Sequence, residues 1–426
     1  MKPFLSRLDN GIRLIVVPIP SLESATVTVW VGTGSRYEES RVGGLSHFLE
    51  HMVFKGSKKR PSAKALSEAI DSIGGQFNAS TSKEWTNFYI KAPARRMNIA
   101  FDVLSDMVIN PLLREEDIQR EKGVIIEEIG MYEDTPLYRI SDVFERLIFT
   151  KSNLGRDILG TKETVSAIKK SDFEDYRAKF YYPRNILITV SGGVKMADIK
   201  KLTEKYFGKL KSSKLDKTEP DKFIFRQSRP GVLLSAKKKD QAHLILGFLG
   251  NPRGHKDRFA ESLLAAILGG GMSSRLFLEV REKRGLAYAI KTNTDHYKDT
   301  GYLATYAGVD IKRVDEAIKV ILNEHYKLTT NSRSLVSKSE FLKAKEFTKG
   351  HLALSLEDTH EVNNFFGIEE LILEKILTPE EVFEKIDKVR VEDVLRVAKE
   401  FFKPERLNLA IIGPYKNQER FERLIS

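Results

Sequence analysis

The order of apolar and polar positions predicts short strands mixed with amphipathic helices along the whole chain. Alternating residues predict strands, and apolar positions recurring every three to four residues predict helices. An Asn-Gly pair at 10–11 predicts a hairpin turn before the first long strand. In the first half, strands are predicted at 12–18, 25–31, 76–81, 86–91 and 185–192, and helices at 45–53, 63–73, 97–109, 114–132, 137–149, 170–180 and 197–207.

A similar order of elements returns later in the chain, after a segment at 209–230 rich in Lys, Ser, Asp, Thr and Pro. The closing strands of the two parts, 186–192 and 407–413, have alike patterns. We therefore predict two topologically similar halves, 1–208 and 231–426, with 209–230 as a linker or hinge.

Strand spacing predicts the fold class. Several neighbouring predicted strands are joined by short turns and not by single helices. Short connections favour antiparallel pairing. The chain is therefore predicted to be α+β, with two antiparallel-rich sheets, each carrying helices on one face.

Composition narrows the functional classes. The net charge is +11, but the basic residues are interspersed with acids and no nucleic-acid-binding motif is present, so we expect no nucleic acid partner. The chain has no Cys, so any zinc must be held by His and carboxylates. No stretch approaches the roughly 18 apolar residues of a membrane span. These features predict a protein without membrane insertion, located in the cytoplasm.

The segment from Gly44 to Val53 carries the strongest chemical signal. His47 and His51 are four residues apart, so on a helix they lie on one face and can bind one metal ion together. Glu50 lies close enough to that face to take a proton from a water molecule activated by the metal. Two histidines on a helix are more often ordinary core or surface residues. An H-x-x-E-H pattern is expected by chance in only about 1% of chains with this composition, and the metal site is favoured.

A third ligand must come from elsewhere, because two histidines leave zinc incompletely coordinated. The Glu-rich helix predicted at 114–132 offers neighbouring candidates, Glu127 and Glu128. Glu128 shares a mostly apolar stripe with Ile125 and Glu121, whereas Glu127 lies on a more polar stripe. We therefore predict Glu128 as the ligand and Glu121 as an acid behind it; the alternative is that both are surface carboxylates.

These motifs resemble those of the pitrilysin-type (inverzincin) zinc peptidases, and most closely the short members of mitochondrial-processing-peptidase size. The resemblance covers essentially the whole chain. The family's H-x-x-E-H is matched by residues 47–51, and its pair of Glu seven residues apart by Glu121 and Glu128. It implies one Zn²⁺ per chain, with His47, His51 and Glu128 as ligands and Glu50 as the catalytic base.

Two further segments match the family. Residues 74–79, Gly-Gly-Gln-Phe-Asn-Ala, resemble the segment whose edge strand pairs with the substrate backbone, which implies substrate binding at Asn78 and Ala79. Residues 281–288 resemble R-x-x-R-G-L-A-Y. There the resemblance implies that Arg281 and Tyr288 bind the substrate carbonyl and stabilise an oxyanion.

The resemblance implies a zinc endopeptidase whose halves close like a clamshell around a peptide or an unfolded polypeptide. Because both residue sets lie on one chain, it favours a homodimer, with a heterodimer as the alternative. Other functions stay open: a processing peptidase that removes leader or targeting segments, a non-catalytic partner subunit of a peptidase pair, or a zinc hydrolase acting on a non-peptide substrate.

Overall fold

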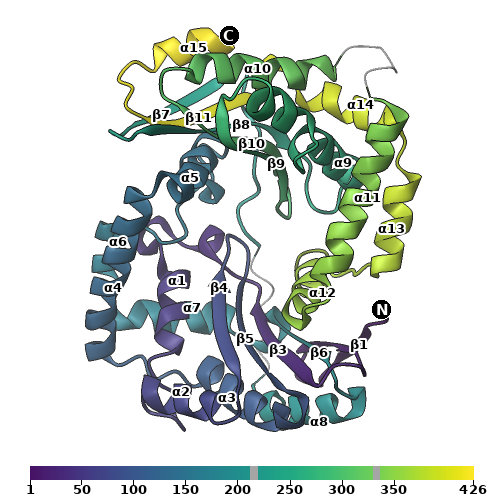
Figure 1. Cartoon of the computed structure of the whole chain (residues 1–426). Helices are drawn as coiled ribbons and strands as arrows, with labels where there is room; N and C mark the ends of the chain where they lie inside the picture. The colour runs from purple at the N-terminus through teal and green to yellow at the C-terminus, as the bar shows by residue number, and fades with distance from the viewer. Residues whose placement is uncertain (212–218, 330–335) are drawn as a thin grey trace. The chain divides into compact units, whose positions relative to one another are not determined.

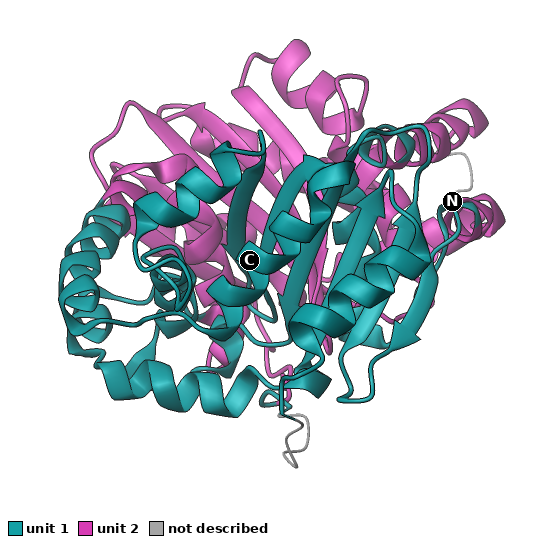
Figure 2. Ribbon diagram, turned by 90° about the horizontal axis from the view of Figure 1, so that it is seen from below, with its two compact units in different colours: residues 1–130, 156–221, 353–380 teal, residues 131–155, 222–352, 381–426 magenta. Residues whose placement is uncertain are grey.

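The computed structural model describes residues 1–211, 219–329 and 336–426. The chain forms two compact units, coloured separately in Figure 2. Unit 1 comprises residues 1–130, 156–221 and 353–380, and unit 2 comprises 131–155, 222–352 and 381–426. Within the described residues, each unit contains one β-sheet with helices packed on it, which confirms the predicted α+β class.

Unit 1 is built on a six-stranded sheet with the order β1-β2-β6-β3-β5-β4. β2 and β6 are parallel, and the other neighbouring pairs are antiparallel. Its strands are β1 (Phe4–Arg7), β2 (Arg13–Pro18), β3 (Ser24–Val31), β4 (Gln76–Thr81), β5 (Thr86–Pro93) and β6 (Ile186–Gly192). Its helices are α1 (Leu45–Val53), α2 (Ala63–Asp71), α3 (Met97–Ile109), most of α4 (Glu115–Asp134), α6 (Lys162–Ala167), α7 (Lys170–Phe180), α8 (Met196–Phe207) and α12 (Thr359–Leu373).

Unit 2 is built on a five-stranded sheet with the order β7-β11-β8-β10-β9. Its strands are β7 (Gly231–Ala236), β8 (Gln241–Gly250), β9 (Ala287–His296), β10 (Gly301–Asp310) and β11 (Leu407–Gly413). Its helices are α5 (Pro136–Ile148), α9 (Arg258–Gly269), α10 (Val314–Lys327), most of α11 (Lys338–Ser355), most of α13 (Pro379–Lys388), α14 (Val391–Phe401) and α15 (Glu419–Ile425). Residues Phe277–Glu282 form a π-helix.

The two sheets share one topology. In unit 2, β7 and β11 are parallel and the remaining pairs are antiparallel, so β7-β11-β8-β10-β9 repeats the order β2-β6-β3-β5-β4 of unit 1. The predicted similarity of the two halves is therefore confirmed. Strand β1 is an addition at the edge of the unit 1 sheet.

One helix of each unit comes from the other half of the sequence. Helix α12, far along the chain, packs against β6 and β3 of unit 1, while α5, from the first half, packs against β11 and β8 of unit 2 (Figure 1). The compact units are thus discontinuous, unlike the continuous halves 1–208 and 231–426 expected from sequence. Part of the expected linker, residues 212–218, lies outside the described residues.

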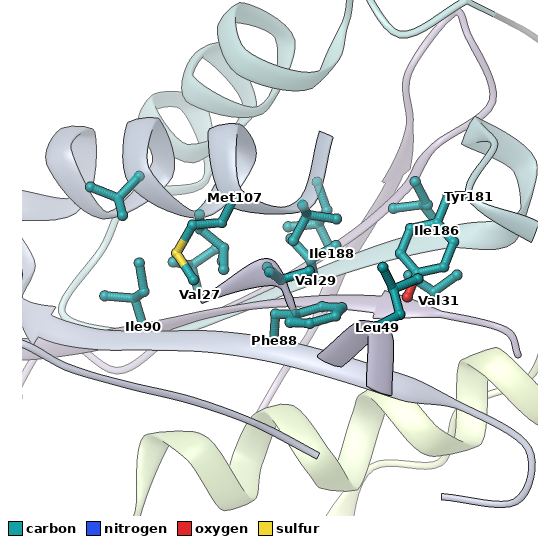
Figure 3. Packing of buried hydrophobic residues seen from close by; sticks show 14 of the residues in the cluster. Val27, Val29, Val31, Leu49, Phe88, Ile90, Met107, Tyr181, Ile186 and Ile188 are labelled. Carbon is teal, nitrogen blue, oxygen red and sulfur yellow. The ribbon is translucent and has the colours of Figure 1, made fainter. Parts of the chain in front are cut away.

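The expectation of helices on only one face of each sheet is wrong for unit 1. Helix α3 packs against β5 and β3, while α12 contacts β3 and β6. Strand β6 is buried along its whole length, as expected of a strand covered on both faces. Figure 3 shows part of the core of this unit, where Val29 of β3, Phe88 of β5 and Leu49 of α1 pack together.

No helix within the described ranges is both long and apolar enough to cross a membrane.

Candidate metal centre

Helix α1 carries the two histidines and is anchored by its apolar residues. Leu45, Phe48, Leu49, Met52 and Val53 are buried in the core of unit 1. The helix begins after Gly44, whose φ of 93° is in the left-handed region that favours glycine. A Cβ at Gly44 would lie 2.4 Å from the carbonyl oxygen of Leu159, so the chain can make this turn only with glycine there.

The predicted ligands converge in unit 1. His47 and His51 of α1 and Glu128 of α4 each offer one donor atom, and these atoms lie within 4.8 Å of one another. Glu128 Oε2 is 3.8 Å from His47 Nε2 and 3.5 Å from His51 Nε2. Donors about 2.0–2.1 Å from a tetrahedral zinc ion are about 3.3 Å apart, so the two distances from Glu128 are slightly longer than those that zinc requires.

Burial keeps His47 neutral. Its side chain is buried, and this burial, with a smaller contribution from the nearby His51, lowers the pKa of His47 to about 3. A neutral imidazole has a free lone pair, as a metal ligand requires. The burial of Glu128 raises the pKa of its carboxyl, opposed by attraction to His51, so binding a cation would favour the ionised form.

Glu121 lies behind His51. His51 Nδ1 is 2.9 Å from Glu121 Oε1, and Lys55 Nζ is 2.5 Å from Glu121 Oε2. Burial acts to raise the pKa of Glu121, but the hydrogen bonds from His51 and Lys55 outweigh it and lower the pKa overall. An ionised Glu121 accepts the Nδ1 proton of His51, which leaves Nε2 free to bind a metal.

Glu50 lies on α1 between the two histidines in sequence and accepts a hydrogen bond from the hydroxyl of Thr81, at the end of β4. Burial raises the pKa of Glu50, and the Thr81 hydrogen bond partly opposes this shift. The contact joins the predicted catalytic base to the strand that is predicted to bind substrate.

Strand β4 forms one edge of the unit 1 sheet, opposite β1, and within the described residues it pairs only with β5. The N–H of Ala79 donates to Oδ1 of Asn78 at 2.9 Å. An edge strand has backbone groups on its open side that an extended peptide can pair with.

Arg281 and Tyr288 lie together in unit 2. The guanidinium carbon of Arg281 is 5.5 Å from the centre of the Tyr288 ring, in cation–π range. The Tyr288 side chain is 77% exposed. The metal-binding group belongs to unit 1, and the roles of Arg281 and Tyr288 stay predictions.

Comparison with family models decides the relationship. The model described as insulinase (peptidase family M16) matches residues 14–162, and the model described as the peptidase M16 inactive domain matches residues 167–347. This chain belongs to peptidase family M16. The assignment confirms the resemblance to pitrilysin-type peptidases drawn from the sequence motifs.

Relatives of this M16 chain are named as zinc proteases. An uncharacterized zinc protease, YmxG, of Bacillus subtilis is 38% identical over 96% of this chain and 98% of its own length. An uncharacterized zinc protease of Streptomyces coelicolor is 35% identical over 97% of this chain and 90% of its own length.

Solved structures share the M16 fold. A protease from Helicobacter pylori matches with a TM-score of 0.87 and 23% identity over 97% of this chain and 99% of its own. A structure titled as a peptidase M16 inactive domain from Pseudomonas fluorescens matches with a TM-score of 0.88 and 17% identity over 98% and 99% of the two chains. At these identities the likeness concerns the fold alone.

Sequence reasoning missed several residues of this M16 centre. Lys55 and Thr81 contact the predicted acids, and Glu38 bonds to the backbone at the start of α1. Lys55 follows His51 by four residues, a helical spacing that could have indicated contact with the same neighbouring helix. No sequence signal marks Glu38, because its segment, 32–39, reads as a polar connection.

Proposed function

We propose that this M16 chain is a zinc-dependent endopeptidase that hydrolyses peptides or unfolded segments, with Glu50 as the general base. One observation carries the proposal: His47, His51 and Glu128 offer three donors within 4.8 Å of one another, with Glu50 on the same helix as the histidines. Two nitrogens and one oxygen are the donor set of catalytic zinc, which keeps a further position open.

Each side chain has a distinct task in this proposal. His47, His51 and Glu128 hold the ion, and Glu121 orients the His51 ring. Zinc held by these residues would supply a Lewis acid, which lowers the pKa of a water molecule and polarises the scissile carbonyl. Glu50 removes the proton from the attacking water and delivers it to the departing amine. Arg281 and Tyr288 stabilise negative charge on the carbonyl oxygen.

The edge strand supports the proposed class of substrate. An edge strand recognises a partner mainly through main-chain hydrogen bonds, so it selects extended polypeptide with little regard to sequence. Strand β4 ends at Thr81, the residue that bonds Glu50, so a peptide paired along Asn78 and Ala79 would run toward the base. A folded protein offers few extended segments free to pair in this way.

Cleavage of a quenched peptide library by wild type and Glu50→Gln, with zinc content measured on both, tests the proposal. We expect wild type to cleave and Glu50→Gln to lose at least about 100-fold in kcat while both hold one zinc per chain. Glu127→Gln is a matched control, because Glu127 is exposed and should leave both readouts unchanged.

Other outcomes would contradict the proposal in different ways. Zinc-bound wild type without cleavage would favour a non-catalytic partner subunit or a hydrolase for a non-peptide substrate. Cleavage restricted to one site in leader-bearing precursors would favour a processing peptidase. Wild type without zinc would overturn the site itself.

A further inference from the structure

The two predicted histidine ligands are held differently. His51 Nδ1 lies 2.9 Å from Glu121 Oε1, which in turn contacts Lys55. The Nδ1 atom of His47 is buried and has no hydrogen-bond partner among the described residues. Metal-binding histidines almost always have such a partner, because it fixes the tautomer and the ring orientation. Something other than a hydrogen bond to the ring must therefore position His47.

The backbone that carries His47 is fixed by one buried carboxylate. Glu38 Oε2 accepts the N–H of Gly44 at 2.8 Å. Glu38 Oε1 accepts both the N–H and the hydroxyl of Ser46, each at 2.6 Å. Gly44 is the N-cap of α1, and Ser46, in its first turn, directly precedes His47. The N–H groups of this turn have no partner within the helix, so the carboxylate satisfies them.

Further contacts hold this carboxylate in place. Ser46 Oγ is 2.8 Å from the hydroxyl of Tyr176, which is 2.8 Å from Thr33 Oγ1. The guanidinium of Arg156 donates to the backbone oxygen of Glu38 at 2.8 Å. Glu38 is only 3% exposed, so its removal would leave buried N–H groups without water to replace it.

We propose that Glu38 is a positioning residue for the metal centre. It fixes the first turn of α1 and so places the His47 imidazole, substituting for the missing hydrogen bond to Nδ1. The inference rests on the proposed zinc site, but not on catalysis. In this proposal Glu38 positions His47, as Glu121 positions His51.

The test measures zinc affinity and not activity. Zinc dissociation constants are obtained by chelator competition for wild type and Glu38→Gln, with the visible absorption of the Co²⁺-loaded proteins as a report on ligand geometry. Gln keeps the size of Glu but replaces one acceptor oxygen with an NH₂ group that cannot accept an N–H. We expect about 10–100-fold weaker zinc binding, as for other residues that orient metal ligands, and an altered Co²⁺ spectrum.

Asp106→Asn is the matched control. Asp106 is a buried carboxylate of unit 1 that also accepts a serine hydroxyl and a backbone N–H, at 2.5 Å from Ser57 Oγ and 2.9 Å from Lys59 N, outside the first turn of α1. We expect it to lower stability with zinc affinity unchanged. If Glu38→Gln and Asp106→Asn lose equal stability and equal zinc affinity, the proposal is overturned. It is also overturned if folded Glu38→Gln binds zinc within about twofold of wild type.

If Glu38→Gln does not fold, Glu38→Asp replaces it. The shorter carboxylate keeps the charge but cannot reach both N–H groups, so at least about tenfold weaker zinc binding is again expected. Zinc-bound wild type that cleaves no peptide would overturn the proposed function, and the affinity comparison would still decide the role of Glu38. Wild type that binds no zinc would overturn both.

Discussion

At the residue scale, two adjacent glutamates on α4 separate into different environments. Glu128 points its Oε2 at both histidines, 3.5 and 3.8 Å from their Nε2 atoms, while Glu127 is exposed. The separation follows from the helix, because neighbouring residues project about 100° apart.

We predict that Glu128→Gln weakens zinc binding by at least about 100-fold, because it removes a ligand and not merely a group that orients one. Glu127→Gln should stay within about twofold of wild type, since this side chain touches none of the donors. Chelator competition on the three proteins measures both effects. Equal losses in the two variants would contradict the assignment of Glu128 as the ligand.

A second residue, Glu261 of α9, links stability to pH. It is fully buried, and this burial raises its pKa from 4.5 to about 7 despite a hydrogen bond from Asn251. The folded state therefore binds the Glu261 proton more tightly than the unfolded state. The stabilisation is complete below about pH 4.5 and is lost as pH rises through about 7.

We predict that Glu261→Gln removes this contribution, worth at most about 3 kcal/mol, from the pH dependence of unfolding. Relative to wild type, the variant should gain stability between pH 5 and 8 as measured by chemical denaturation. Glu384→Gln, at an exposed position, should keep the wild-type slope. An unchanged slope in Glu261→Gln would show that Glu261 is ionised in the folded protein.

At the scale of single elements, α12 covers the unit 1 sheet through polar contacts. The Asn363 amide donates to Thr26 O, Thr28 Oγ1 and Thr189 O within 3.2 Å. At Gly367 the helix approaches Trp30 so closely that an added Cβ would lie 2.6 Å from the indole ring. Hydrogen bonds and a close glycine contact thus fix the position of this helix.

We predict that Gly367→Ala destabilises the protein by about 1–3 kcal/mol, because the methyl group must displace the fully buried Trp30 or move the helix. Gly350→Ala in α11 is the control, since its Cβ would meet nothing within 4 Å. The control should be neutral or stabilising by about 0.5–1 kcal/mol. Denaturant unfolding of both variants measures the difference, and similar effects would contradict the tight fit at Gly367.

At the scale of the whole molecule, the exchange of α5 and α12 makes each unit depend on both halves of the sequence. Without α12, the unit 1 sheet would expose Trp30, Thr26 and Thr28, which are buried in the intact protein. Without the unit 2 sheet, α5 would expose the apolar residues Ile140, Val143 and Phe144.

We predict that residues 1–208 expressed alone do not form a stable fold, because this fragment lacks α12 and leaves α5 without its sheet. Co-expression with residues 209–426 should restore a soluble complex. Size-exclusion chromatography and denaturant unfolding of the fragment, alone and with its complement, check this. A cooperatively folded, monomeric 1–208 fragment would contradict the exchange as a requirement for folding.

The proposed catalytic residues come from both units, since Arg281 and Tyr288 belong to unit 2. We predict that Arg281→Ala lowers kcat by about 10²–10³-fold with zinc content unchanged, as for the loss of an oxyanion donor. Arg284→Ala, three residues away and paired with Glu279, should have little effect. Recovery of activity on mixing Arg281→Ala with Glu50→Gln would show that two copies of the chain supply the set together.

The sequence alone determined most elements and the identity of the candidate metal residues. Helix α1, the His47–His51 spacing and the preference for Glu128 over Glu127 follow from local periodicity, which depends on helical geometry and needs no knowledge of distant contacts. The repeated order of strands likewise lies within each half of the sequence.

Only the tertiary structure decided which polar residues are buried, and by which distant segments of the chain. The Thr26 and Thr28 face of β3 alternates with valines and reads as solvent-facing, yet α12 buries it from more than 300 residues along the chain. In the sequence Glu38 looks like part of a polar loop, yet its side chain is buried against the start of α1. Hydrophobic patterns reveal apolar burial, whereas polar groups buried with hydrogen-bond partners look like surface until their distant partners are known.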